Sequence, residues 1–86
     1  MKEELRKIAE EMIAARWPDQ YALLDIIDHQ YGFSLIFMNK KINNRFSPTI
    51  IPTQLAHNLL IKNSPTARRT FESELETAFA KERISG

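Results

Sequence analysis

Apolar residues recur at helical spacing near the start of the chain, in "KEELRKIAEEMIAAR" (residues 2–16). They occupy one face of a 3.6-residue period, and charged residues fill most other positions. The members of this apolar face are Leu5, Ile8, Ala9, Met12 and Ile13. The pattern predicts an amphipathic helix that ends at Trp17 and Pro18, because the residue before a proline avoids helical backbone angles.

The next segment, "YALLDIIDHQYGFSLIFMNKK" (residues 21–41), is compatible with two structures. A helix would place Asp25, Asp28 and His29 on one polar stripe. A β-hairpin would pair "YALLDIID" with "FSLIFMN" across "HQYG", where the glycine suits a positive φ. In the second run large apolar residues alternate with Ser34, Ile36 and Met38. We favour the hairpin, although periodicity alone does not settle such short apolar runs.

The segment "KINNRFSPTIIP" (residues 41–52) predicts a polar turn followed by a short strand. Pro48 and Pro52 restrict that strand to the edge of a sheet, because proline has no N–H to donate. A helix is expected from Thr53, which would be its N-cap. Its apolar surface would come from Leu55, Leu59 and Ile61.

A last helix is expected with Ser64 as its N-cap and Pro65 at its first position. Its buried face would consist of Ala67, Phe71, Leu75, Ala78 and Phe79. Its exposed face would carry Glu72, Glu74, Glu76, Lys81, Glu82 and Arg83, and residues 84–86 would fray. The chain is therefore expected to form a single α+β domain over residues 1–86. Its order would be α-β-β-(β)-α-α, with the helices packed on one face of a short antiparallel sheet.

Composition bears on the oligomeric state and the cellular location of this domain. A chain of 86 residues without cysteine buries a thin core and has no disulfide or thiolate ligand to stabilise it, so a homo-oligomer is one expected arrangement. The stretch from Tyr21 to Met38 is interrupted by charged residues, and a membrane span needs about 20 largely uncharged ones. The charged start "MKEELRK" does not resemble a secretory signal, so we expect a cytoplasmic protein without a membrane partner.

Charge is distributed unevenly, although 12 basic and 11 acidic residues give a net charge of only +1. Between Asn39 and Arg69 the chain carries basic residues and no acid. We predict that this interval binds a macromolecule, and that its two basic segments form one patch if the fold brings them together. The predicted site residues are Lys40, Lys41, Asn43, Asn44, Arg45, Lys62, Asn63, Thr66, Arg68 and Arg69.

The stretch "TQLAHNLLIKNSPTARRTF" (residues 53–71) resembles a helix-turn-helix DNA-binding motif. In that resemblance Ala56 is the small residue between the helices and Ile61 is the buried residue after the turn. Thr66, Arg68 and Arg69 would face the bases, with Lys62 and Asn63 near the phosphates. Leu60 stands where glycine is common, "KNSP" makes the turn longer than usual, and the helix is acidic beyond Phe71. The alternative is a plain αα-hairpin with solvated arginines.

No catalytic, metal or cofactor site is expected. Asp25, Asp28 and His29 are close in sequence, but with the distant His57 they form a poor ligand set for any metal. No nucleophile elbow surrounds any serine, and two glycines are too few for a loop that cradles phosphate.

These observations favour a small non-enzymatic regulatory or adaptor protein that binds another protein, and an inhibitor of a nucleic-acid-handling machine is one such protein. The partner would pair with an exposed strand edge or with complementary charge. The alternative is a DNA-binding regulator that uses the divergent helix-turn-helix at residues 53–71.

Overall fold

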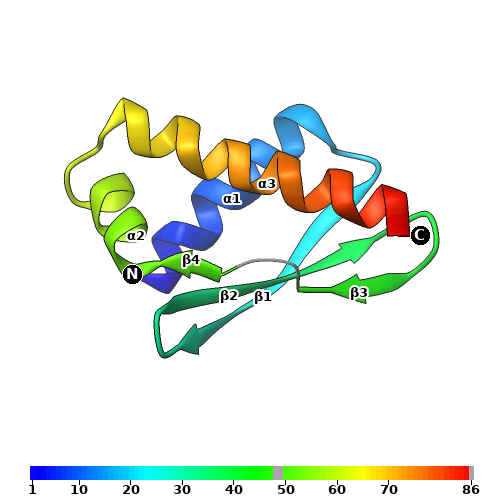
Figure 1. Ribbon diagram of the computed structural model, residues 1–86. Helices are drawn as coiled ribbons and strands as arrows, with labels where there is room; N and C mark the ends of the chain where they lie inside the picture. Colours follow the sequence, from blue (N-terminus) through cyan, green and yellow to red (C-terminus); the bar gives the residue numbers. More distant parts are fainter. Residues whose placement is uncertain (48–49, 86) are drawn as a thin grey trace.

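The computed structural model describes residues 1–47 and 50–85, with side chains up to residue 82. The order is α1 (Lys2–Arg16), β1 (Tyr21–His29), β2 (Gly32–Asn39), β3 (Asn44–Phe46), β4 (Ile50–Pro52), α2 (Thr53–Leu60) and α3 (Pro65–Ser85). The helices lie together on one side of the antiparallel sheet (Figure 1). The predicted α+β class and the placement of the helices on one face are confirmed.

Strand β2 is the centre of the sheet. It pairs with β1 along one side, and two short strands share its other side. Strand β4 pairs with the start of β2, where Phe33 lies opposite Ile51, and β3 pairs with its end, where Phe37 lies opposite Phe46. In the gap between the two short strands, the Ser47 hydroxyl donates to the Leu35 carbonyl at 3.1 Å. The predicted edge strand is thus split in two, with Pro52 at the end of β4, whereas Pro48 lies outside the described residues.

A β-bulge in β1 explains why the sequence pattern of this segment was ambiguous. Leu23 pairs with Phe37 and Asp25 with Ile36, so Leu24 is an extra residue without a partner opposite. Because of this residue, both Leu23 and Ile26 face the core although they are three positions apart. The spacing of buried residues therefore changes from two to three within one strand. The predicted β-hairpin is confirmed, with Gln30 and Tyr31 as its loop.

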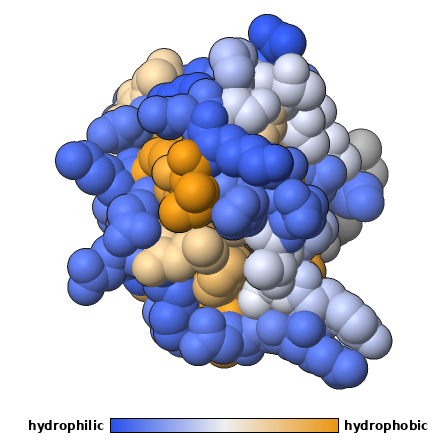
Figure 2. All heavy atoms as spheres, turned by 90° about the vertical axis from the view of Figure 1, so that its left-hand side faces the viewer, coloured by the Kyte–Doolittle hydropathy of each residue, from blue (hydrophilic) through white to orange (hydrophobic). Residues whose placement is uncertain are grey.

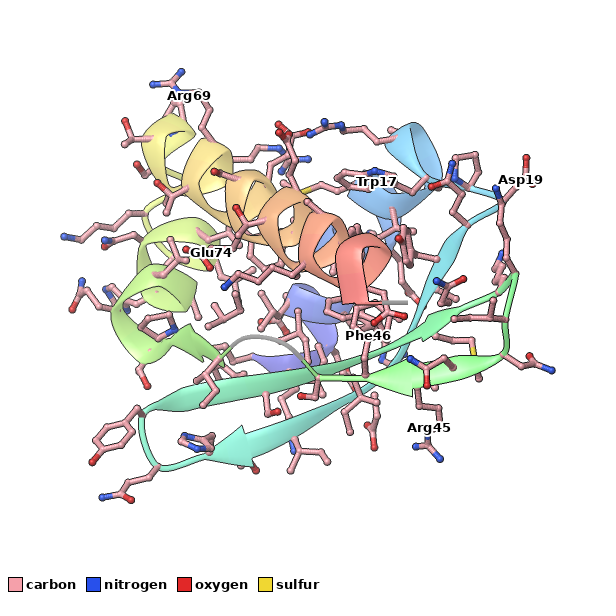
Figure 3. The ribbon with its side chains drawn as sticks, turned by 45° about the vertical axis from the view of Figure 1, so that its right-hand side comes forward. Trp17, Asp19, Arg45, Phe46, Arg69 and Glu74 are labelled. Atoms are coloured by element: carbon pink, nitrogen blue, oxygen red, sulfur yellow. The ribbon has the colours of Figure 1, made fainter. Side chains whose placement is uncertain are left out.

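The core lies between the sheet and helices α1 and α3, and Phe79 of α3 is at its aromatic centre. Its ring stacks on Tyr21 at 4.0 Å and meets the edges of Trp17 at 4.9 Å and Phe37 at 5.0 Å. Figure 3 shows Phe46 between the sheet and α3, and its ring centroid is 6.1 Å from that of Phe79. Residues from α3, from strands β1, β2 and β3 and from the end of α1 thus meet in one cluster.

Most predicted helix boundaries are confirmed. Helix α1 ends at Arg16, and α3 begins at Pro65 with the Ser64 hydroxyl accepting from the Ala67 N–H at 3.2 Å. The predicted cap at Thr53 is wrong, because the N-cap of α2 is Pro52. Thr53 is instead the first helical residue, and its N–H donates to the Tyr31 carbonyl at 3.1 Å. Strand β4 therefore runs directly into the helix.

The faces of α3 are also largely as predicted. All five residues of its predicted apolar face are buried: Ala67, Phe71, Leu75, Ala78 and Phe79. Glu82 is the exception on the predicted exposed face, because it is only 8% exposed and accepts a hydrogen bond from the Asn44 amide at 3.1 Å. Helix α3 continues to Ser85, and Gly86 lies outside the described residues. Over the described part of the chain, no helix combines the length and apolar character that crossing a bilayer requires.

Candidate functional site

The first half of the predicted basic site lies at the β2–β3 turn. This turn set comprises Lys40, Lys41, Asn43, Asn44 and Arg45. The Lys40 ammonium donates to the Pro18 carbonyl at 3.0 Å, and Asn44 is held by Glu82 as described above. Asn43 has a φ of 55°, a left-handed conformation that asparagine tolerates better than most residues. Lys41 and Arg45 are exposed, and they make no ion pair among the described residues.

The second half lies where α2 turns into α3. This corner set comprises Lys62, Asn63, Thr66, Arg68 and Arg69, and all five are exposed. Asn63 has a φ of 54° in the turn, so it too has a backbone role. Figure 2 views the end of the molecule that carries α2, where hydrophilic atoms surround a small hydrophobic area. Ile61 is 63% exposed, so it is not the buried residue expected after a helix-turn-helix turn, whereas Ala56 is fully buried as expected.

The fold does not bring the turn set and the corner set together. Asn44 contacts Glu82, whereas Arg69 lies thirteen residues earlier in α3, which corresponds to about 20 Å along a helix. Figure 3 shows Arg69 and Arg45 at opposite ends of the molecule. The two basic segments were predicted to form one patch only if the fold brought them together, and this patch is therefore not formed. The reason is that α3 runs along the sheet, with one set near each of its ends.

Two arginines of the corner set line a groove between α1 and α3, which we call the α1–α3 groove. It has a volume of about 400 Å³ and is lined by Glu11, Met12, Ala15, Pro65, Arg68, Arg69 and Glu72. Neither arginine makes an ion pair among the residues described. The groove thus combines two available cations with two carboxylates and an apolar floor.

Arg16 ties α1 to α3 beside this groove. Its guanidinium lies 2.8 Å from a Glu76 oxygen, 3.6 Å from a Glu72 oxygen and 4.4 Å from the Trp17 ring centroid. The hydrogen bond to Glu76 is the largest cause that raises the pKa of Arg16 above its ordinary value, and the charges of both glutamates add to it. Glu72 is therefore already paired with Arg16, and Arg68, Arg69 and Glu11 are the charged groups of the groove without an ion pair among the described residues.

The two aspartates of β1 form ion pairs with α1. Lys2 lies 3.1 Å from Asp28, and Arg6 lies 3.6 Å from Asp25, so both carboxylates are paired with cations of α1. Within the described residues, no group of three or more histidine and acidic side chains is placed to hold a metal ion. Three of the serines also have partners: the hydroxyls of Ser34 and Ser47 lie 2.9 Å apart, and Ser64 caps α3.

The sequence prediction missed the face of the sheet that is turned away from the helices, which we call the open sheet face. Its apolar members are Ala22, Leu24, Ile27, Ile36, Met38 and Ile50. Leu24 is 37%, Ile27 47% and Ile50 38% exposed. The sequence of β2 already indicated this face. Ile36 and Met38 are apolar, although they occupy the positions of an alternating strand that point away from the core.

The comparisons with known proteins give no relative: no protein-family model matches the chain, no curated protein matches its sequence, and no solved structure matches it.

Proposed function

We propose that this chain is a small non-enzymatic regulatory or adaptor protein of the cytoplasm, and that it acts by binding another protein in the α1–α3 groove. The supporting observation is the pair Arg68 and Arg69, which are exposed and unpaired among the described residues beside an open groove of about 400 Å³. Unpaired cations at a concave surface attract complementary carboxylates and orient the approaching partner.

The lining of the groove favours a protein over a nucleic acid. Glu11 and Glu72 balance the charges of Arg68 and Arg69 in the groove lining, so the groove has no net positive charge to neutralise the many phosphates of a nucleic acid. Met12, Ala15 and Pro65 supply an apolar floor that suits a hydrophobic side chain. A protein segment with an acidic residue beside an apolar one fits both features. We therefore propose an acidic, partly apolar segment as the bound element.

We further propose that the partner is a nucleic-acid-handling machine that the chain inhibits. Size supports this part of the proposal. A standard protein interface covers about 800 Å² on each partner, and this domain has 5312 Å² of accessible surface. A domain of this size therefore has enough surface to cover a substrate-binding site on a larger protein.

The second candidate is a DNA-binding regulator that uses α2 and α3. It is favoured by the exposure of Lys62, Thr66, Arg68 and Arg69 around one helix corner, and by the absence of acid from the first turn of α3. In this mode the start of α3 would contact the major groove, and affinity would fall steeply with rising salt as counterions are released.

A pair of variants with equal charge change tests both candidates. Arg68→Glu with Arg69→Glu and Lys40→Glu with Lys41→Glu each remove two positive charges and add two negative ones, at opposite ends of the molecule. A partner captured by the wild type should be lost with the first variant and retained by the second. Binding of the purified partner should then weaken at least tenfold in titration calorimetry, which corresponds to about 1.4 kcal/mol.

Duplex DNA at low salt gives the other arm of the same experiment. Salt-sensitive DNA binding that Arg68→Glu with Arg69→Glu abolishes would favour the second candidate. A partner that both variants lose equally would mean that net charge, rather than the groove, governs binding, and would contradict the first proposal.

A further inference from the structure

The open sheet face exposes apolar side chains that no described segment of the chain covers. Helices α1, α2 and α3 all lie on the opposite side of the sheet (Figure 1). Ile27 is 47% and Ile50 is 38% exposed on the two outer strand positions, with Ser34 between them on β2. Ile36 and Met38 follow on β2, two and four residues further along the same face. Several apolar side chains exposed on one face of a small domain, with polar residues beside them, commonly mark a contact with another protein.

Charges on this face lie on opposite edges. Asp25 is on β1, level with Ile36, and Arg45 is on β3, level with Met38. Figure 3 shows Arg45 pointing away from the helices, and it makes no ion pair among the described residues. Asp25 is 58% exposed, with Arg6 3.6 Å away at the sheet edge. The β3 edge of the open face thus carries a cation without an ion pair among the described residues, and the β1 edge carries a carboxylate with Arg6 as its one paired cation.

We propose that a second copy of this chain covers the open sheet face, in a face-to-face dimer whose two-fold axis runs parallel to β2. This axis places β2 over β2, and β1 of each copy over β3 and β4 of the other. Asp25 and Arg45 differ in level by two residues, which is about 7 Å along a strand. An arginine side chain spans this offset, so each Arg45 reaches the Asp25 of the other copy.

The alternative two-fold axis, across the strands, is disfavoured by charge. It would place β1 over β1, with Asp25 facing its own symmetry copy. It would also place Arg45 over the apolar Ile50. Burying an unpaired guanidinium against an isoleucine is unfavourable. Charge complementarity therefore selects the axis parallel to β2.

The area of the face sets the expected strength of the dimer. The sheet is three strands wide, which is roughly 15 Å, and the eight residues of β2 are roughly 27 Å long. The face therefore has a projected area of about 400 Å². This is about half of the roughly 800 Å² per partner that a standard specific interface buries, and it corresponds to a weak, transient contact. We expect a reversible dimer with a dissociation constant in the micromolar range. The α1–α3 groove lies on the helical side, so this dimer neither requires nor blocks the proposed binding in that groove.

Sedimentation equilibrium from about 1 µM to about 1 mM tests the dimer. The wild-type mass should rise with concentration from 10.0 kDa toward twice that value. Ile27→Glu with Ile50→Glu should remain monomeric throughout. The matched control is Ile61→Glu, since Ile61 is an exposed isoleucine at the α2–α3 corner, and this variant should dimerise like the wild type. A wild-type protein that remains at 10.0 kDa at the highest concentration overturns the proposal.

Charge exchange tests the axis. Asp25→Arg alone would place arginine against arginine, and Arg45→Asp alone would place aspartate against aspartate, so each should weaken dimerisation at least tenfold. An equimolar mixture of the two should form a heterodimer, because both of its edge contacts become arginine with aspartate. Failure of the mixture to associate, with both variants folded by circular dichroism, overturns the axis. If Asp25→Arg does not fold, the isoleucine variants decide whether the face is an interface.

Discussion

Gly32 lies where the backbone of β4 passes very close to β2. A Cβ at this position would overlap the carbonyl oxygen of Ile51, and the φ of 156° is one that residues with a side chain rarely adopt. Two asparagines have a related role, since Asn43 and Asn63 occupy the left-handed region in the turns of the predicted site. Part of the polar character that suggested binding in those turns is therefore explained by backbone geometry.

Replacing Gly32 by alanine should lower the free energy of unfolding by about 2 kcal/mol or more, through strain and the clash with β4. Urea denaturation followed by circular dichroism measures this change. Gln30→Ala, in the adjoining exposed loop, is the control and should leave the midpoint nearly unchanged. Equal midpoints for the two variants would contradict the close approach of β4.

At the scale of elements, the bulge in β1 reconciles a non-alternating sequence with a strand. Leu23 and Ile26 both face the core because Leu24 is an extra residue between them. Strand β2 has no such irregularity, and its buried residues Leu35 and Phe37 are two positions apart. The two strands should therefore respond differently to the loss of one residue.

Deletion of Leu24 should be tolerated, because regular alternation would then keep both Leu23 and Ile26 on the core face. We expect cooperative unfolding and a loss below about 2 kcal/mol, part of it from the Arg6 bond to the Leu24 carbonyl. Deletion of Ile36 in β2 is the control. It forces Leu35 or Phe37 off the core, and the loss should exceed about 3 kcal/mol in urea denaturation. Similar losses for both deletions would show that the bulge has a further role.

At the scale of the whole molecule, stability depends on a cluster that joins distant parts of the chain. Phe79 contacts Trp17 at the end of α1, Tyr21 on β1 and Phe37 on β2. The Tyr21 hydroxyl also donates to the Phe79 carbonyl at 3.3 Å. Phe79 and the aromatic residues around it therefore attach α3 both to the end of α1 and to the sheet.

Phe79→Ala should cost about 3–5 kcal/mol. A domain of 86 residues has a total stability of about 4–13 kcal/mol, so this variant should lose a large share of it and should unfold at a temperature lower by more than about 10 °C. Thermal unfolding measures the effect, and Ile61→Ala at an exposed position should change stability by less than about 0.5 kcal/mol. A cooperative transition at the wild-type temperature for Phe79→Ala would contradict the central place of this cluster.

The sequence predicted those features that depend on neighbouring residues. The end of α1 at Trp17, the start of α3 after Ser64 and the apolar face of α3 follow from local backbone preferences and periodicity, and all are confirmed. The β-hairpin was predicted with a helix still open as an alternative, because the bulge breaks the alternation that distinguishes a strand. Thr53 was assigned a cap that Pro52 occupies, since pairing with β2 extends to the start of α2.

Local backbone preference and the hydrophobic pattern specify the fold class, most element boundaries and the identity of the exposed basic residues. Tertiary structure alone decided which residues meet. It placed the turn set and the corner set at opposite ends, buried Glu82 against Asn44, and positioned Arg68 and Arg69 beside a groove. It also placed all three helices on one side of the sheet, so that no described segment covers the other face. These relations depend on contacts between segments far apart in the chain, which no local pattern encodes.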